Sequence, residues 1–177
     1  HVLADKPMAI NSDNFGLLKE CFDIARQKGI LLYDIMTERH EITTILQREL
    51  SCIPAVYGEQ LQGTPEEPAI VKESVHHFFK VVSGNPLKRP AWFFDVTQQG
   101  EGIVDVTTHL VDLVQWEAFP GQIIDYKKDI ELIDANRWTT SISPEEFKQV
   151  TGTEAYPDFL KKDVENDTLK VYCNGDI

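Results

Sequence analysis

Cysteine is scarce in this sequence of 177 residues, which contains Cys21, Cys52 and Cys173. The three residues are odd in number, widely spaced and form no C-x-x-C pair, so they favour reduced thiols over a disulfide framework or a zinc site. No run approaches the roughly 18 apolar residues of a membrane span, and no positively charged segment precedes a short apolar one, as in a secretory signal. We therefore expect no membrane association and a cytoplasmic location.

Basic residues are too few to balance the acidic ones. The chain has 17 Lys and Arg against 29 Asp and Glu, which gives a formal net charge of −12. This charge disfavours nucleic acids and anionic membrane surfaces as partners, because both would be repelled. The hydrophobic fraction of 42% and the charged fraction of 26% are typical of a globular protein with a core. The sequence also lacks internal repeats and low-complexity segments.

Both ends of the chain read as strands. Residues 1–4 (HVLA) form a short apolar run, and residues 168–177 (TLKVYCNGDI) form another with no turn or cap after it. Natural domains rarely begin and finish inside strands. We therefore expect this chain to be a piece of a longer polypeptide, incomplete at its C-terminus.

The first 36 residues predict a strand, a helix and a second strand. The helix runs from an N-cap at Asn11 or Ser12 to about Gln27, and Gly29 is a plausible residue to end it. Apolar side chains recur at helical spacing along it: Phe15, Leu18, Phe22 and Ala25. The apolar run 30–36 (ILLYDIM) predicts the second strand.

The remainder mixes helices and strands. Helices are predicted at 38–50 and 101–117, and a further helix starts at Ser143 with the capping-box pattern of Ser143, Pro144 and Glu146. Strands are predicted at 55–63 and 129–140, and the segment 71–83 fits either a helix or a strand. The order of elements indicates an α/β fold that grades into α+β.

A polar stripe runs along the predicted helix 101–117. At about 100° per residue, Asp105, His109, Asp112 and Trp116 share one side, and apolar residues cover the opposite side. An Asp four residues before a His can orient the imidazole, which prepares a general base. The same spacing also fits a surface Asp–His pair of little energetic weight. A metal site would need a third ligand that the sequence does not mark, so we predict none.

Two glycines precede this helix, but they do not form a dinucleotide loop. That loop requires G-x-G-x-x-G directly after a strand, and position 105 is Asp where the third glycine would stand. We expect Gly100 and Gly102 to let the backbone turn tightly into the helix, so that its first turn can approach a bound molecule.

Two segments together resemble a known family. HVLADKPMAI (1–10) is similar to the "KHVLCEKPLA" strand and turn of the glucose–fructose oxidoreductase / inositol dehydrogenase / MocA family, and GEGIVDVTTHLVDLVQW (100–116) is similar to its "GGGxLxDxGxHxxDLxxW" helix. The segments stand in the family's order, about 100 residues apart, and the resemblance covers at least residues 1–120. It implies the tail of a doubly wound Rossmann sheet at 1–36. It also implies a substrate-binding and oligomerisation domain at 37–177, with an open, mostly antiparallel sheet and helices on one face.

The resemblance implies roles for individual residues. Lys6 matches the lysine that hydrogen-bonds the reacting hydroxyl, His109 matches the general acid/base, and Asp105 matches the aspartate that binds a neighbouring hydroxyl and supports the histidine. Asp5 and Pro7, with Lys6, would contact the cofactor, although Asp5 stands where the family more often has Glu.

Four further positions bear on substrate binding. Arg39, with His40 beside it, would lie at a strand end facing the substrate, and His77 could also line the pocket. Thr107 stands where the family often has Gly, which narrows the space near that helical turn. The two departures from the family, at Asp5 and Thr107, bear on the identity of the substrate and not on the class of reaction.

The resemblance also implies a reaction. An NAD- or NADP-dependent oxidoreductase would move a hydride between a secondary alcohol of a sugar or cyclitol and nicotinamide. The phosphate-binding loop is expected upstream of His1, so this piece alone is expected to be inactive, and a homodimer or homotetramer would form through the C-terminal sheet. Two alternatives remain open: an NAD-dependent glycosidase of the same superfamily, and a non-catalytic binding or oligomerisation module.

Overall fold

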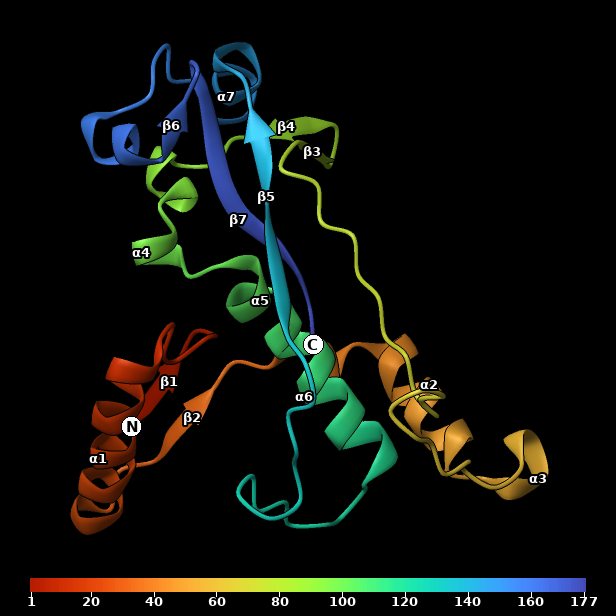
Figure 1. Ribbon diagram of the computed structural model, residues 1–177. Helices are drawn as coiled ribbons and strands as arrows, with labels where there is room; N and C mark the ends of the chain where they lie inside the picture. Colours follow the sequence, from red (N-terminus) through yellow and green to blue (C-terminus); the bar gives the residue numbers. More distant parts are fainter.

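A three-stranded antiparallel sheet forms the C-terminal part of the molecule, at the top of Figure 1. In the computed structural model, which describes residues 1–177, the long strands β5 (Asn136–Ile142) and β7 (Thr168–Asp176) pair along their length, and the short β6 (Val164–Glu165) pairs with the other edge of β7. Helix α7 (Pro144–Thr151) and the 3-10 helix η3 (Asp158–Asp163) pack beside this sheet.

The hydrophobic core lies against this sheet. Of the 11 buried residues in the chain, 7 form one cluster, made of Phe94, Ile142, Phe147, Val150, Leu160, Leu169 and Val171. The rings of Phe94 and Phe147 meet edge-on with their centroids 5.5 Å apart. Since each fully buried large apolar side chain contributes about 1.5–3 kcal/mol, this cluster makes the C-terminal sheet the most firmly held part of the chain.

Helix α7 begins as the sequence predicts. The Ser143 hydroxyl accepts from the Glu146 backbone N–H (3.2 Å), and the Glu146 carboxylate accepts from the Ser143 N–H (2.8 Å). Pro144 occupies the first helical turn, and Gly152 ends the helix in the left-handed conformation with φ 79°. The predicted capping box is therefore confirmed.

The first 36 residues form a strand–helix–strand unit, at the lower left of Figure 1. Strand β1 (Val2–Ala4) pairs in parallel with β2 (Leu32–Asp34), and α1 (Ser12–Lys28) connects them. The Asn11 side chain accepts from the Asn14 N–H (3.0 Å) and Gly29 ends the helix at φ 62°, so both predicted caps are confirmed.

The segment predicted as a strand at 55–63 is not one. After η1 (Thr37–His40) and α2 (Ile42–Ser51), the chain makes one more helical turn, α3 (Pro54–Tyr57), and residues 58–63 join no sheet. Pro54 stands at the first helical position, where its fixed φ favours a helix, and Gly58 at φ 81° ends the turn. These local signals outweigh the apolar run.

Two other predicted elements are shorter than expected. The ambiguous segment 71–83 is extended and then pairs as a hairpin, β3 (Lys80–Val82) with β4 (Asn85–Leu87). The predicted strand 129–140 begins only at Asn136, because its register partner Asp176 is the last residue of β7 and the preceding residues have no strand to pair with. The class is nevertheless a mixed α/β fold, as predicted, although the strands form three small separate sheets.

The predicted helix 101–117 is divided into α5 (Gly102–Asp105) and α6 (Thr107–Ala118), which follow η2 (Ala91–Phe94) and α4 (Val96–Gln99). The Thr108 hydroxyl donates to the Val104 carbonyl at the division, and the His109 N–H donates to Val106 O, only three residues back (3.0 Å). Threonine hydroxyls that bond the preceding turn often bend helices. None of the helices in the chain is long and apolar enough to cross a membrane.

The two glycines before α5 allow close packing inside the protein. A Cβ at Gly102 would lie 2.8 Å from Cys173 Cα, and closer still to the Cys173 carbonyl, so α5 rests directly on the backbone of β7. Gly100 has φ +86°, and a Cβ there would lie 3.1 Å from Ile10 Cγ2. We expected these glycines to let a bound molecule approach the helix closely. The groups that approach them are instead the backbone of β7, at Gly102, and the side chain of Ile10, at Gly100.

Asp95 ties the core to helix α4. It is buried, caps α4 through Thr97 N–H (3.1 Å), and accepts from Gln98 Nε2 (2.9 Å) and Lys162 Nζ (3.2 Å). Burial by itself would raise the pKa of the Asp95 carboxyl, but these hydrogen bonds outweigh it and lower the pKa to about 2.

Replacing Gly102 with Ala should destabilise the chain, because the new methyl group forces α5 and β7 apart. We expect a loss of about 1–3 kcal/mol in the free energy of unfolding, measured by urea titration followed by circular dichroism. Gly16→Ala is the matched control: Gly16 lies inside α1, an added Cβ there would have no atom within 4 Å, and the change should add about 0.5–1 kcal/mol. Equal stability of Gly102→Ala and the wild type would contradict the packing described.

Acid should weaken the fold partly through Asp95. Because its pKa is lowered in the folded state, its contribution is complete above the unfolded-state value of about 4 and is lost as the pH falls towards about 2. Asp95→Asn should therefore be less stable than the wild type at neutral pH, and the difference should shrink between pH 4 and 2. Urea titrations of both proteins at several pH values test this, and a difference independent of pH would count against it.

Candidate functional site

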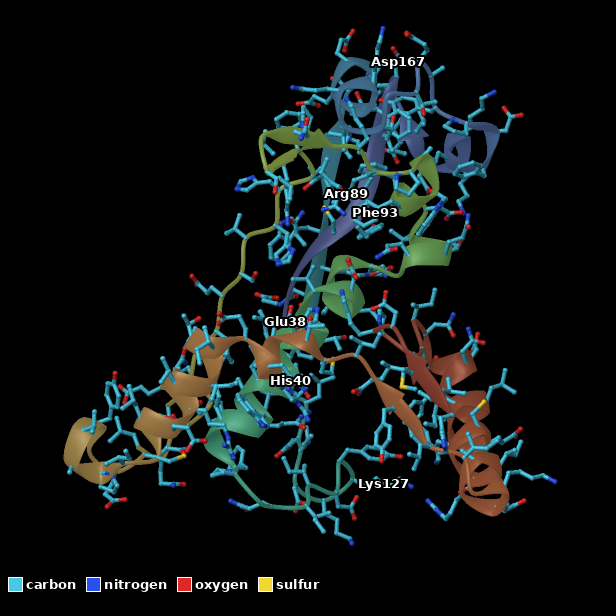
Figure 2. The ribbon with its side chains drawn as sticks, turned by 180° about the vertical axis from the view of Figure 1, so that it is seen from behind. Glu38, His40, Arg89, Phe93, Lys127 and Asp167 are labelled. Carbon is cyan, nitrogen blue, oxygen red and sulfur yellow. The ribbon has the colours of Figure 1, made fainter.

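Two parallel strands deliver side chains to the same place. Ala4 in β1 is the register partner of Asp34 in β2, so the carboxyl ends of the two strands lie side by side. Lys6 follows β1, and η1 with Glu38 and Arg39 follows β2. In α/β sheets, ligands bind beyond the carboxyl ends of parallel strands. Figure 2 shows Glu38 near the centre of the molecule, between the N-terminal unit and the C-terminal sheet.

The first contact across this place joins Lys6 to α5. Lys6 Nζ lies 2.7 Å from Asp105 Oδ1 and also donates to the Asp105 carbonyl oxygen at 2.8 Å. The two side chains are only 21% and 16% exposed, so water screens the ion pair weakly. The lysine and the aspartate that the sequence singled out are thus brought together from positions 99 residues apart.

The second contact joins His109 to η1. His109 Nδ1 lies 2.6 Å from Glu38 Oε2, and the histidine side chain is 12% exposed while that of Glu38 is 40% exposed. Nδ1 is buried and has no aligned hydrogen-bond partner, so this is a close contact without hydrogen-bond geometry. Glu38 is a site residue that sequence reasoning missed, although its neighbours Arg39 and His40 were singled out.

The third contact joins Asp112 to Arg39. The guanidinium donates through Nε to Asp112 Oδ2 (2.7 Å) and through a second nitrogen to Asp112 Oδ1, which makes the pair bidentate. These hydrogen bonds raise the pKa of Arg39 above its ordinary value, although burial acts in the opposite sense. Arg39 is therefore held on α6, one helical turn beyond His109.

The far end of the stripe is occupied by structural contacts. The Arg48 guanidinium stacks on the Trp116 ring at 4.8 Å and donates to its carbonyl oxygen (3.1 Å). Next to it, Glu117 Oε2 lies 2.6 Å from Lys72 Nζ in an ion pair and accepts a hydrogen bond from Gln47 Nε2 (3.3 Å). These contacts attach α2 and the extended segment that contains Lys72 to α6. The candidate acid–base groups of the stripe are at its other end, at Asp105 and His109.

The adjacent histidines, His76 and His77, are both exposed. Desolvation of the His76 ring, and then the charge of Lys80, lower the pKa of His76, and the charges of Lys6, Asp105 and His109 also act on it. His76 is therefore within electrostatic range of Lys6, Asp105 and His109. His77, for which the sequence suggested substrate contact, is exposed and takes part in none of the ion pairs described.

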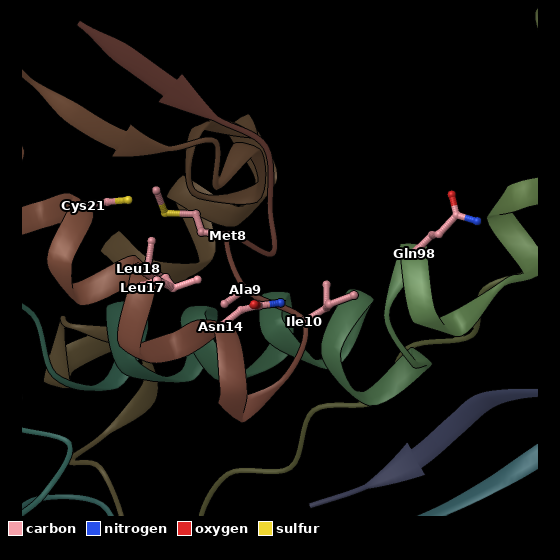
Figure 3. A pocket seen from close by; sticks show the side chains of 8 residues that line it. All are labelled: Met8, Ala9, Ile10, Asn14, Leu17, Leu18, Cys21 and Gln98. Atoms are coloured by element: carbon pink, nitrogen blue, oxygen red, sulfur yellow. The ribbon is translucent and has the colours of Figure 1, made fainter.

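The predicted cofactor-contact residues form the turn after β1. The Asp5 carboxylate accepts from the Lys6 backbone N–H (2.9 Å), and the Lys6–Pro7 peptide is cis. Beyond this turn is an open hollow of about 350 Å³, shown in Figure 3. Its lining is mostly apolar and consists of Met8, Ala9, Ile10, Asn14, Leu17, Leu18, Cys21 and Gln98. It lacks acid–base side chains of the kind gathered at His109. No group of three or more His, Cys, Asp or Glu side chains is arranged to hold a metal ion.

Known proteins resemble this chain. Residues 46–177 match the family described as "Putative oxidoreductase C terminal domain". A crystal structure of a "putative oxidoreductase" from Parabacteroides merdae is 84% identical in sequence and superposes with a TM-score of 0.94. The similarity covers 99% of this chain and 40% of that one, so the chain spans well under half the length of this relative. No curated protein matches the chain.

The Arg39–Asp112 pair should be energetically coupled. A double-mutant cycle with Arg39→Met and Asp112→Asn, measured by urea unfolding, should give a coupling of about 1 kcal/mol, because the pair is bidentate but Arg39 is 39% exposed. The pair of Arg26 and Asp23 is the control: it is 3.5 Å apart and highly exposed, and its coupling should stay below about 0.3 kcal/mol. Equal couplings would show that the bidentate geometry contributes nothing.

Proposed function

The chain belongs to this oxidoreductase C-terminal domain family, and on that premise we propose that it is part of an NAD- or NADP-dependent oxidoreductase acting on a secondary alcohol of a sugar or cyclitol. Residues 1–36 would be the end of the dinucleotide-binding domain, and residues 37–177 would belong to the substrate-binding domain. The similarity of 1–10 and 100–116 to the glucose–fructose oxidoreductase / inositol dehydrogenase / MocA family supports this more specific assignment.

One observation carries the proposal: beyond the carboxyl ends of two parallel strands, Lys6 pairs with Asp105, and His109 stands four residues further along the same helical stripe, against Glu38. A lysine ammonium can polarise a hydroxyl and an imidazole can take its proton, and Lys6 is paired with Asp105, one helical turn before His109. Their low exposure, 21% for Lys6 and 12% for His109, suits chemistry that must exclude water. The alternative interpretation, an isolated surface pair of Asp105 and His109, does not account for the ion pair between Lys6 and Asp105.

The residues present suit a nicotinamide cofactor. The turn with Asp5, Lys6 and Pro7 directly follows β1, and such strand ends are where dinucleotides bind in doubly wound sheets. The cofactor supplies the hydride chemistry when bound. The phosphate-binding loop is not among these residues, since G-x-G-x-x-G does not occur in the sequence.

The protein's own groups would divide the remaining work. Lys6 would donate a hydrogen bond to the reacting oxygen while Asp105 holds its ammonium group in position. His109 would take the hydroxyl proton during oxidation and return it during reduction. Arg39, held by Asp112, would contact the rest of the substrate. A homodimer or homotetramer through the C-terminal sheet is part of the proposal, supported by the exposed Trp138 on β5 and Tyr172 on β7.

His109→Asn in the longer protein should keep the fold and the cofactor affinity but lower turnover by about 10²–10⁴, the range of a positioned acid/base. Lys6→Ala should also lose activity, whereas Asp112→Asn should be milder because it acts on Arg39. Asp158→Asn, which changes a carboxylate on η3 that is 93% exposed, is the control and should leave turnover unchanged. Steady-state kinetics and product analysis on free sugars, cyclitols and glycosides provide the measurement.

Near wild-type turnover of His109→Asn on a confirmed substrate would end this assignment. Release of an aglycone without net reduction of the cofactor would instead favour the glycosidase alternative. The absence of turnover on every substrate class would favour the non-catalytic module.

A further inference from the structure

We infer that Glu38 is the positioning residue of His109: it holds the proton on Nδ1 and so leaves Nε2 as the nitrogen that faces the reacting hydroxyl. This inference rests on the proposed function for the role of His109. It replaces the expectation that Asp105, four residues earlier on the same stripe, supports the histidine.

The distance and the burial of the contact support this assignment. Glu38 Oε2 is 2.6 Å from His109 Nδ1, and Nδ1 is buried with no other polar partner. A buried polar nitrogen without a partner is costly, so a carboxylate at this distance is the group that can satisfy it. Glu38 is 40% exposed, so its carboxylate is free to turn into line with the Nδ1–H bond.

Asp105 is already engaged. Lys6 Nζ donates both to its carboxylate (2.7 Å) and to its carbonyl oxygen (2.8 Å). An Asp105 carboxylate that turned to His109 would leave the Lys6 ammonium, only 21% exposed, without its anion. The structure thus gives each of the two acids a separate duty: Asp105 holds the lysine, and Glu38 faces the histidine.

Glu38 is held in place by its own short helix. Its neighbour Arg39 hydrogen-bonds to Asp112, which lies three residues beyond His109 on α6. Two successive residues of η1 therefore contact two successive turns on the same face of α6. The Thr37 hydroxyl also donates to Glu38 Oε2 at 3.2 Å. The Arg39–Asp112 pair therefore sets the register that brings Glu38 to His109.

The chemical consequence concerns the tautomer of the imidazole. In a neutral histidine only one ring nitrogen carries a proton, and the hydrogen bond at one nitrogen decides which one. A carboxylate at Nδ1 favours the proton there, which makes Nε2 the free base. Other charged or titratable groups on the elements that meet this face are Lys6, Asp105, Arg39 and Asp112, and His76 interacts electrostatically with Lys6, Asp105 and His109.

The tautomer can be measured directly, without a substrate. ¹⁵N NMR of the chain labelled in histidine, at alkaline pH where imidazoles are neutral, distinguishes the two forms, and His109→Gln identifies the signals of His109. We expect the wild type to hold mainly the Nδ1–H form. Glu38→Ala should change the majority to the Nε2–H form, which free histidine favours, and Glu38→Gln, which keeps an acceptor oxygen, should preserve the wild-type form.

Asp105→Asn distinguishes the two acids. If Glu38 is the partner, this variant should leave the tautomer of His109 unchanged, whereas a change in Asp105→Asn with none in Glu38→Ala would overturn the inference. An Nε2–H majority in the wild type would overturn it as well. Because the readout is the tautomer, the result stands apart from the turnover of His109→Asn, which tests the proposed function.

Discussion

The rest of the structure depends on the polar contacts made by one face of α5 and α6, which carries Asp105, His109 and Asp112. These side chains take partners from two other elements: Lys6 from the turn after β1, and Glu38 and Arg39 from η1. Figure 1 shows why this matters, because the N-terminal unit, α2 with α3, and the C-terminal sheet extend from this helix in different directions. Partly buried ion pairs here hold together parts that share little apolar core.

That face is positioned in turn by the C-terminal sheet. The buried cluster around Phe94, Phe147 and Leu160 stabilises β7, and Gly102 allows α5 to lie directly on the β7 backbone. Because position 102 has no side chain, α5 can lie close to β7, and this affects the position of α6 and of His109. Apolar packing supplies the stability, and the polar face supplies the specificity with which the strand ends are placed.

Several local features were predictable because they depend on near neighbours in the chain. The caps of α1 and α7 follow from Asn11, Gly29, Ser143 and Glu146, whose partners lie within a few residues. The apolar run at 55–63 misled because strand pairing needs a second strand, and none lies beside it, whereas Pro54 and Gly58 act locally. The division of the helix at Val106 was missed for a related reason, since it depends on a threonine hydroxyl that competes with the backbone.

The sequence by itself determined the mixed α/β class, the helical stripe and the residue types that carry the chemistry, because periodicity and capping are short-range properties. Only the tertiary structure decided which side chains meet. The spacing of Asp105 and His109 suggested a pair, but Lys6, distant in sequence, takes the aspartate, and Glu38 lies against the histidine. Which groups form ion pairs depends on their distance and burial in the folded chain, not on their spacing in the sequence. A carboxylate that lies close to a partly buried cation interacts with it more strongly than a carboxylate that is only a few residues away along the chain.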